Sequence, residues 1–224
     1  MSHDNKIRAI RSWIECRKVL DIGCVDHSCS IEQTSDWMHR RLVNIADIVV
    51  GIDVLQEDVQ RLKEKGFDIR LGDAQSFSLG EDFDVVFAGE VIEHLADFSG
   101  FFRSVKNHLR PHGVLIITTP NVFSLWHYYN ALLGLPTANP EHVCWFDCQT
   151  LRTLVERHGL FVVSLNLVRN ATWTEVRSAA CNHDFKQFFW TAISYAIETL
   201  LPPRVGRKSI VMVCRVEDVH EVAL

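Results

Sequence analysis

Residues Phe83–Pro120, FDVVFAGEVIEHLADFSGFFRSVKNHLRPHGVLIITTP, hold two strongly apolar segments with a polar cluster and an amphipathic stretch between them. The first segment, Phe83–Ala88, is too uniformly apolar to have one solvated face, which is typical of a central parallel strand covered by helices. Val114–Thr119 has the same character. Ligands of open parallel sheets bind beyond the carboxyl ends of the strands, so candidate functional residues should follow Ala88. The polar residues there are Glu90, Glu93 and His94.

Similar apolar segments lie on both sides of this stretch and indicate an alternating α/β pattern. Beyond the two segments already named, strands are predicted at Val19–Val25, Ile48–Asp53, Phe67–Ala74, Leu160–Leu167 and Ser209–Val216. Apolar residues at helical spacing predict helices at residues 4–17, 37–45, 56–65, 98–109 and 149–158. This order predicts an α/β fold with a doubly wound, seven-stranded, mostly parallel sheet. We expect one domain over residues 1–224, with helical and aromatic cap segments on the substrate side at residues 121–142 and 171–205.

Composition and charge limit the partners of the chain. Its 224 residues are 47% hydrophobic and carry a formal net charge of −5, and the basic residues are scattered. A nucleic-acid partner is therefore disfavoured, and a small, neutral or partly apolar partner is favoured. The charged N-terminus and the absence of an apolar run of about 18 residues predict a cytoplasmic protein with no transmembrane segment. Seven cysteines without zinc-site spacing predict reduced thiols.

Three predicted strands end in residues suited to hold a nucleoside. Gly23, near the end of the first strand, lets the backbone turn sharply and lets a ligand approach it closely. Asp53, at the end of the second strand, is placed to accept hydrogen bonds from ribose hydroxyls. The alternative is that Asp53 caps the helix that follows. Asp73, at the end of the third strand, is placed to accept a hydrogen bond from an exocyclic amine of a base.

Five motifs, in this order and spacing, resemble the class I S-adenosylmethionine-dependent methyltransferases. They are VLDIGC (19–24), VVGIDV (49–54), LGDA (71–74), FDVVFAGEVIEHL (83–95) and LRPHGVLIITTPN (109–121). The resemblance covers about residues 19–168 and implies a Rossmann-like fold that binds S-adenosylmethionine. It implies cofactor contacts at Asp21 and Gly23 beside the methionine, Asp53 followed by Val54 at the ribose, Asp73 and Ala74 at the adenine, and Gly89 and Glu90 at the methyl end. The chain departs from the family's glycine-rich turn at Val25 and His27, where glycines are usual.

The segment GEVIEHL followed by TTPN is similar to a narrower branch, the ubiquinone-pathway O-methyltransferases, and also to bacterial small-RNA 2′-O-methyltransferases. There a Glu-x-x-Glu-His motif and a later histidine hold a divalent metal. The resemblance places these ligands at Glu90, Glu93, His94 and His142. A helix that begins at this motif would bring its three side chains to one face at i, i+3 and i+4, where they would converge on Mg²⁺, Mn²⁺ or Zn²⁺. The alternative is that the acids only favour the positive end of a helix dipole.

Three functions remain open from the sequence. The first is methyl transfer to a hydroxyl oxygen of a small-molecule acceptor, which would be aromatic, a sugar or lipid-linked. His94, His142 and Glu93 are the candidate catalytic residues, because methyl transfer to oxygen needs a proton removed and imidazole titrates near neutral pH. The alternatives are RNA 2′-O-methylation with a divalent metal, and a non-catalytic subunit that binds S-adenosylmethionine and docks on a partner. The apolar stretch Asp184–Leu201 fits a cap over the acceptor or a homodimer contact, with membrane-surface contact as a further alternative.

Overall fold

The computed structural model of the chain describes residues 4–25, 36–136, 138–169, 177 and 185–216. The described strands are β1 (Lys18–Ile22), β2 (Ile48–Asp53), β3 (Ile69–Leu71), β4 (Phe83–Gly89), β5 (Leu109–Pro120), β6 (Leu160–Val168) and β7 (Ser209–Val216). The described helices are α1 (Asp4–Ile14), α2 (Met38–Val43), α3 (Gln56–Glu64), α4 (Phe98–His108), α5 (Leu125–Leu132), α6 (Cys148–Arg157), α8 (Phe185–Leu200) and α9 (Pro203–Gly206). A 3₁₀ turn, η2 (Ile92–His94), follows β4.

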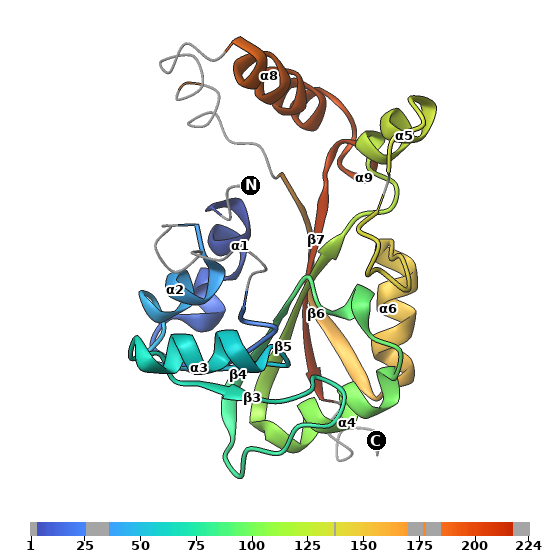
Figure 1. The fold of residues 1–224 in the computed structure, drawn as a ribbon. Helices are drawn as coiled ribbons and strands as arrows, with labels where there is room; N and C mark the ends of the chain where they lie inside the picture. Colours follow the sequence, from blue (N-terminus) through green and yellow to red (C-terminus); the bar gives the residue numbers. More distant parts are fainter. Residues whose placement is uncertain (1–3, 26–35, 137, 170–176, 178–184, 217–224) are drawn as a thin grey trace.

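The seven strands form one sheet in the order β3-β2-β1-β4-β5-β7-β6 (Figure 1). The first five strands in that order pair in parallel, whereas β7 runs antiparallel to both of its neighbours. β1 and β4 lie side by side although β2 and β3 come between them in the chain. The β1/β4 boundary is therefore the switch point of the sheet, where open α/β sheets bind ligands. The prediction of a doubly wound, seven-stranded, mostly parallel sheet is confirmed.

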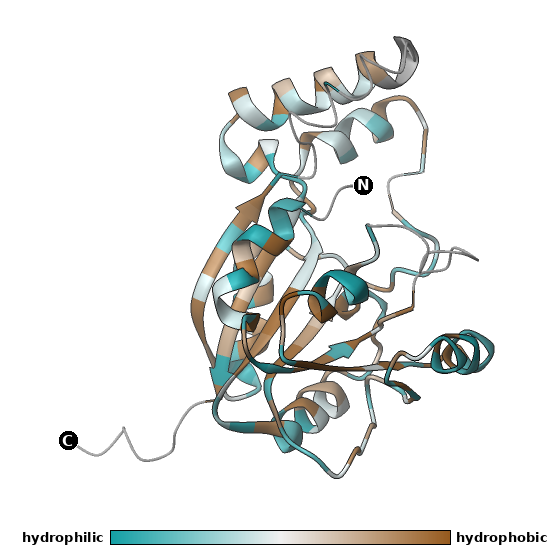
Figure 2. Cartoon of the chain, turned by 90° about the vertical axis from the view of Figure 1, so that its left-hand side faces the viewer, coloured by the Kyte–Doolittle hydropathy of each residue, from teal (hydrophilic) through white to brown (hydrophobic). Residues whose placement is uncertain are grey.

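Helices cover both faces of the sheet. α1, α2 and α3 lie on one face, and α4 and α6 lie on the other (Figure 1). The strands form a mainly brown, hydrophobic layer between them in Figure 2. Ile10 of α1 packs in one core cluster with Phe87 of β4, while Phe101 of α4 packs in the other with Val86. Because successive residues of a strand point to opposite faces, β4 contributes to both cores and is buried almost throughout.

The structure departs from the predicted elements on both sides of α4. The strand expected at Val114–Thr119 already begins at Leu109, because Leu109 pairs with Phe83 before a register shift in the β4/β5 ladder. No α-helix begins at Glu90, whose φ of +57° is a left-handed conformation that a right-handed helix does not continue. Only the short 3₁₀ turn Ile92–His94 follows. The condition under which Glu90, Glu93 and His94 would share one face of a helix is therefore not met.

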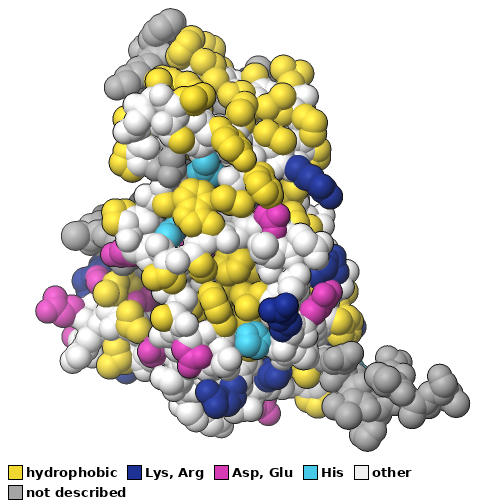
Figure 3. Space-filling view, turned by 90° about the vertical axis from the view of Figure 1, so that its right-hand side faces the viewer, with side chains coloured by type: hydrophobic (Ala, Val, Ile, Leu, Met, Phe, Trp, Pro, Cys, Tyr) yellow, Lys and Arg dark blue, Asp and Glu magenta, His cyan; other side chains and the backbone are white. Residues whose placement is uncertain are grey.

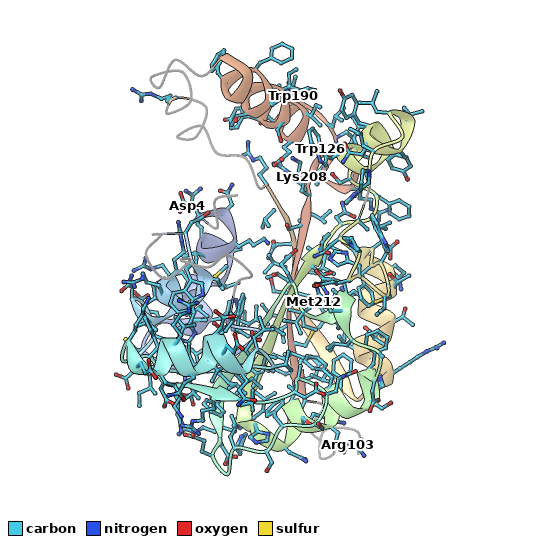
Figure 4. The ribbon with its side chains drawn as sticks, viewed as in Figure 1. Asp4, Arg103, Trp126, Trp190, Lys208 and Met212 are labelled. Carbon is cyan, nitrogen blue, oxygen red and sulfur yellow. The ribbon has the colours of Figure 1, made fainter. Side chains whose placement is uncertain are left out.

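α5 and α8 lie near each other beyond the carboxyl ends of the parallel strands (Figure 1). Trp126 of α5 meets Trp190 of α8 edge-on with ring centroids 6.2 Å apart. Lys208 Nζ lies 4.4 Å from the Trp126 ring centroid (Figure 4). Hydrophobic side chains gather over this part of the molecule (Figure 3), and Leu132 and Leu200 are 86% and 81% exposed. Within the described residues, no helix has both the length and the apolar character needed to span a membrane.

Candidate active site

The switch point of the sheet is built on a turn that requires glycine. Gly23, directly after β1, has a φ of +70°, and a Cβ there would lie 2.5 Å from Cγ2 of Val91. The N–H of Gly23 donates a hydrogen bond to the Ile52 carbonyl of β2 at 2.9 Å. Gly89 ends the neighbouring strand β4. At both strands of the switch point, β1 and β4, a glycine therefore leaves the backbone at the edge of the sheet without a side chain.

Asp21 of β1 is buried, with 2% of its surface exposed. Its Oδ2 lies 2.8 Å from Nδ1 of His39 in α2, and the His39 side chain is fully buried. Burial raises the pKa of Asp21, and the hydrogen bond with His39 opposes this rise. No motif or spacing in the sequence connects these two positions. His39 is thus a residue at the site that sequence reasoning missed.

Asp53, at the end of β2, uses its carboxylate to join two loops. Oδ2 accepts a hydrogen bond from the Val25 N–H at 2.9 Å, and Oδ1 accepts one from the Leu55 N–H at 3.1 Å. The N-cap residue of α3 is Leu55 and no side chain caps the helix, so Asp53 is not a helix cap. A carboxylate has about four lone-pair directions, so Asp53 keeps acceptor capacity for ribose hydroxyls. His27, the other departure from the glycine pattern, lies outside the described residues.

Two adjoining cavities, of about 490 and 350 Å³, open at the switch point. Of the positions predicted for the cofactor, the first cavity is lined by Asp21 and Gly89, the second by Asp53, Val54, Asp73 and Ala74, and both by Gly23 and Glu90. Asp73 is exposed, and its Oδ1 accepts a hydrogen bond from the Gln75 N–H at 2.8 Å. All eight positions that the resemblance assigns to the cofactor therefore line these two adjoining cavities, with Asp21 in the first, Asp53 and Asp73 in the second and Glu90 in both.

Glu90 stands at the boundary of the first and second cavities. Its Oε1 lies 2.8 Å from Nζ of Lys6 in α1 and accepts a hydrogen bond from Thr118 Oγ1 at 3.0 Å. The Lys6 side chain is only 7% exposed, whereas that of Glu90 is 35% exposed, so the cation of this ion pair is buried and the carboxylate is half-buried. Sequence reasoning missed Lys6, because its partner lies far away in the chain and a lysine in an amphipathic helix normally faces water.

Glu93, His94 and His142 come together on the other side of this boundary. Their ligand atoms all lie within 4.8 Å of one another, and in the described part of the chain they form the single group of this kind. The rings of His94 and His142 are perpendicular, with centroids 4.7 Å apart. Glu90 does not belong to this group. The structure therefore brings together three of the four predicted metal ligands and places Glu90 with the cofactor positions instead.

The side chain of Glu93 is almost completely buried. It is 2% exposed, and its Oε2 accepts a hydrogen bond from Thr119 Oγ1 at 2.9 Å. Its Oε1 is buried and has no hydrogen-bond partner among the described residues. Nε2 of His142 lies 4.0 Å from this oxygen, which is beyond hydrogen-bonding distance. Burial, with the charge of Glu90 as the second cause, raises the pKa of Glu93 to about 8.

His142 is held beside Glu93 by the backbone of its own loop. The Val143 and Cys144 N–H groups donate to the Glu93 carbonyl at 2.9 and 3.3 Å, and the His142 N–H donates to the Asn139 carbonyl at 3.0 Å. Burial, followed by the neighbouring His94, lowers the pKa of His142. Its imidazole is therefore neutral at pH 7 and able to accept a proton.

A third cavity, of about 220 Å³, adjoins the first, and Glu93 and His142 line both. Its other walls are mainly aromatic or apolar and include Trp126, His127, Trp145, Phe146, Pro120 and Pro136. The rings of His127 and Trp145 lie 4.6 Å apart. The polar cluster of Glu93 and His142 thus stands between a cavity bordered by the predicted cofactor residues and an aromatic cavity large enough for a small ring.

Comparison with known proteins agrees with this architecture. A sequence profile described as a methyltransferase domain matches residues 8–165, which is more than half of the chain. The ubiquinone biosynthesis O-methyltransferase of Bartonella quintana is 26% identical over 161 residues, which cover 65% of this chain and 61% of that protein. The mitochondrial one of Bos taurus is 31% identical over 181 residues, covering 71% of this chain and 46% of that protein. The match thus spans about three fifths of the first relative and less than half of the second.

Solved structures share the fold at low sequence identity. An S-adenosylmethionine-dependent methyltransferase from Archaeoglobus fulgidus has a TM-score of 0.59 at 19% identity, over 93% of this chain and 90% of that one. A methyltransferase described in complex with the Haloferax volcanii Trm112 methyltransferase activator has a TM-score of 0.63 at 16% identity, over 96% and 90% of the two chains. The profile match and these folds confirm the resemblance seen in the sequence motifs, and the chain belongs to the methyltransferase domain family, in the class I S-adenosylmethionine-dependent fold.

Proposed function

We propose that the chain transfers the methyl group of S-adenosylmethionine to a hydroxyl oxygen of a small-molecule acceptor. The observation that carries this proposal is the position of Glu93 and His142, which line both the cavity at the switch point and the aromatic third cavity. An acceptor in the third cavity would present its hydroxyl to these side chains. The ubiquinone biosynthesis O-methyltransferases to which the chain is similar support oxygen as the accepting atom.

In this proposal the cofactor lies across the first two cavities. Asp53 accepts hydrogen bonds from the ribose hydroxyls, Asp73 and Ala74 border the adenine, and Asp21 with Gly23 borders the methionine. S-adenosylmethionine supplies an activated methyl group on a sulfonium, so the protein mainly has to position the acceptor and accept its proton. The open turn at Gly23 lets the chain approach its ligand without a side chain in the way.

His142 is the proposed proton acceptor when no metal is bound. Its lowered pKa keeps the imidazole neutral at pH 7, whereas the raised pKa of Glu93 keeps that carboxyl largely protonated there. The loop hydrogen bonds to the Glu93 carbonyl hold His142 at the third cavity. His94, whose ring packs edge-on against that of His142, would orient it.

The aromatic third cavity favours an acceptor with a planar ring, although a sugar or a lipid-linked molecule stays within the proposal. Trp126 lines this cavity and packs against Trp190, so α5 and α8 would together cover the acceptor as the cap segments that the sequence predicts. Residues 171–176 and 178–184 of the second segment lie outside the described part of the chain. A homodimer contact and a cytoplasmic location stay predictions, and RNA acceptors and a non-catalytic role stay alternatives without specific support.

The cluster of Glu93, His94 and His142 also fits a divalent metal, which we propose as a second feature of the site. The buried and unpartnered Oε1 of Glu93 is an atom that a cation would satisfy, and the group offers one oxygen and two imidazole nitrogens. Such a mixed donor set suits Zn²⁺ or Mn²⁺ better than Mg²⁺, which prefers oxygen. A bound metal would lower the pKa of the acceptor hydroxyl. His142 would then serve as a ligand rather than as the proton acceptor.

The proposed function is tested with labelled S-adenosylmethionine and a panel of phenols, catechols, sugar alcohols and amines. His142→Ala should lower kcat on a hydroxyl acceptor by about 10²-fold or more, because it removes the proton acceptor or a metal ligand. His112→Asn is the matched control, since it replaces an exposed histidine at a positive φ that Asn tolerates, and it should leave kcat unchanged. Methylation of amines only, or no binding of S-adenosylhomocysteine by calorimetry at high micromolar concentration, would contradict the proposal.

Metal binding is tested by equilibrium dialysis against Zn²⁺ and Mn²⁺ with measurement of the protein-bound metal. Glu93→Gln should abolish binding of about one ion per chain, because it removes the buried anionic ligand. Glu90→Gln is the matched control, because Glu90 lies three positions away and outside the cluster, and it should retain the metal. Equal metal content in the two variants, or no metal in the wild-type protein, would rule out the site.

A further inference from the structure

His39 lies in a closely fitting and largely apolar enclosure beside β1. Its ring centroid is 5.0 Å from that of Trp37 and 5.9 Å from that of Phe67, which meets it edge-on. A Cβ built on Gly51 would lie 3.0 Å from Cε1 of His39, so the ring also packs closely on the backbone of β2. With the side chain fully buried, these contacts fix the orientation of the imidazole.

The fixed ring aims one nitrogen at Asp21. Nδ1 of His39 lies 2.8 Å from Oδ2 of Asp21. An ionised carboxylate only accepts hydrogen bonds, so Nδ1 carries the proton when Asp21 is charged. Nε2 of His39 is buried and has no hydrogen-bond partner among the described residues.

Asp21 lines the first cavity, where the proposed function places the methionine part of the cofactor. Burial raises the pKa of Asp21 and the nearby Asp53 adds to this rise, whereas the hydrogen bond and charge of His39 oppose it. Among the described residues the structure gives Asp21 no other side-chain hydrogen bond. Because Oδ2 is taken by His39, Oδ1 is the oxygen with which Asp21 would accept a hydrogen bond from a cationic ligand group.

We propose that His39 is a positioning residue for the cofactor: its Nδ1–H holds the Asp21 carboxylate ionised and oriented so that the second oxygen receives the α-ammonium of S-adenosylmethionine. This inference rests on the role of Asp21 in the proposed function. His39 does not touch the cofactor and takes no part in methyl transfer. It sets the affinity for the amino-acid end of the cofactor and leaves recognition of the adenosine end to the second cavity.

The experiment compares two ligands that differ only at the amino-acid end. S-adenosylhomocysteine carries the ammonium, whereas 5′-methylthioadenosine has the same thioether and adenosine without it. Calorimetry measures both dissociation constants for the full chain and for His39→Asn, His39→Gln and Asp21→Asn. The Asn amide nitrogen reproduces the Nδ1 donor of histidine, whereas the longer Gln carries its amide nearer to the Nε2 position, so this pair is matched in chemistry and differs in reach.

His39→Gln should lower the affinity for S-adenosylhomocysteine about tenfold, because one hydrogen bond to a buried charged group is lost. The same variant should leave the affinity for 5′-methylthioadenosine within about twofold of the wild-type value. His39→Asn should restore the affinity for S-adenosylhomocysteine to within about threefold of the wild-type value. The double variant Asp21→Asn/His39→Gln should bind S-adenosylhomocysteine no more weakly than Asp21→Asn alone, because His39 acts through Asp21. Thermal unfolding checks that each variant is folded, and His39→Asn gives a result even where His39→Gln does not fold.

The possible failures separate the two claims. If His39→Gln loses equal affinity for both ligands, or if His39→Asn does not restore the affinity for S-adenosylhomocysteine, the positioning role is overturned and His39 is a packing residue. Normal binding of S-adenosylhomocysteine by Asp21→Asn would instead remove Asp21 from the proposed cofactor site. A loss in Asp21→Asn with none in His39→Gln would overturn only the inference about His39.

Discussion

Glu90 and Glu93 are three positions apart in the sequence, yet their surroundings give the two carboxylates different roles. Glu90 is half-buried and its charge is compensated by Lys6. Glu93 is buried with one oxygen bonded to Thr119 and the other unpartnered among the described residues. Burial and then the charge of Glu90 raise the pKa of Glu93 to about 8. Glu93 is therefore the carboxyl of this pair that a divalent cation would most stabilise, and Glu90 is the one suited to border a cationic cofactor.

The sequence could locate the residues at the strand ends because parallel strands bring their carboxyl ends to one edge of the sheet. Asp53 and Gly23 follow directly from that rule. It could not locate His39, whose role depends on a ring enclosure assembled from three separate segments. The resemblance to metal-binding methyltransferases also grouped Glu90 with the two histidines, whereas the positive φ of Glu90 separates it from them. Side-chain convergence across loops is set by tertiary packing, which no local pattern records.

The observed ends of the strands and helices agree with the predicted ends to different degrees. β2 and β7 match their predicted ranges, Ile48–Asp53 and Ser209–Val216, because apolar segments with polar flanks mark their ends. β3 is shorter than the predicted Phe67–Ala74, since it is an edge strand that pairs only with β2 over Ile69–Leu71. α6 begins one residue before the prediction, at Cys148, because Asp147 supplies its N-cap.

The N-cap of α6 gives a prediction at the scale of a single helix. Oδ1 of Asp147 accepts a hydrogen bond from the Thr150 N–H at 2.6 Å, and Thr150 Oγ1 accepts one from the Asp147 N–H at 2.9 Å. Asp147→Ala should lower the free energy of unfolding by about 1 kcal/mol at pH 7, whereas Asp147→Asn should stay close to the wild-type value, because Asn caps as well as Asp. Urea unfolding of the three proteins measures both effects.

The same cap predicts how the difference depends on pH. Burial alone would raise the pKa of Asp147, but the hydrogen bonds from Thr150 hold it below its ordinary value of 3.8. A lowered pKa stabilises the folded state above pH 3.8, and this contribution is lost as the pH falls further through the folded-state pKa. The difference between wild type and Asp147→Ala should therefore be constant from pH 5 to pH 7 and shrink below pH 3.8. A constant difference down to the acid transition would show that the cap acts without its charge.

At the scale of the whole molecule, the site is where separate parts of the chain are tied together. Lys6 of α1 reaches Glu90 after β4, and Thr118 of β5 joins the same carboxylate. The loop with His142 is bonded to the Glu93 carbonyl by Val143 and Cys144. The N-terminal helix, the switch-point strands and the loop before α6 therefore meet at the two acids, so a change in α1 should alter the cavities at the switch point.

Lys6→Met tests this connection. It leaves the half-buried Glu90 without its cation and beside Glu93, so it should lower the free energy of unfolding by about 1–3 kcal/mol. It should also change the affinity for S-adenosylhomocysteine severalfold, because Glu90 lines both cavities at the switch point and its charge is then no longer compensated. Arg11→Met is the matched control, since it removes a positive charge from the same helix at a pair with Glu15 that is more than half exposed, and such pairs contribute less than about 1 kcal/mol. Urea unfolding and calorimetry measure the two effects. Equal unfolding free energies and equal ligand affinities in the two variants would contradict the connection.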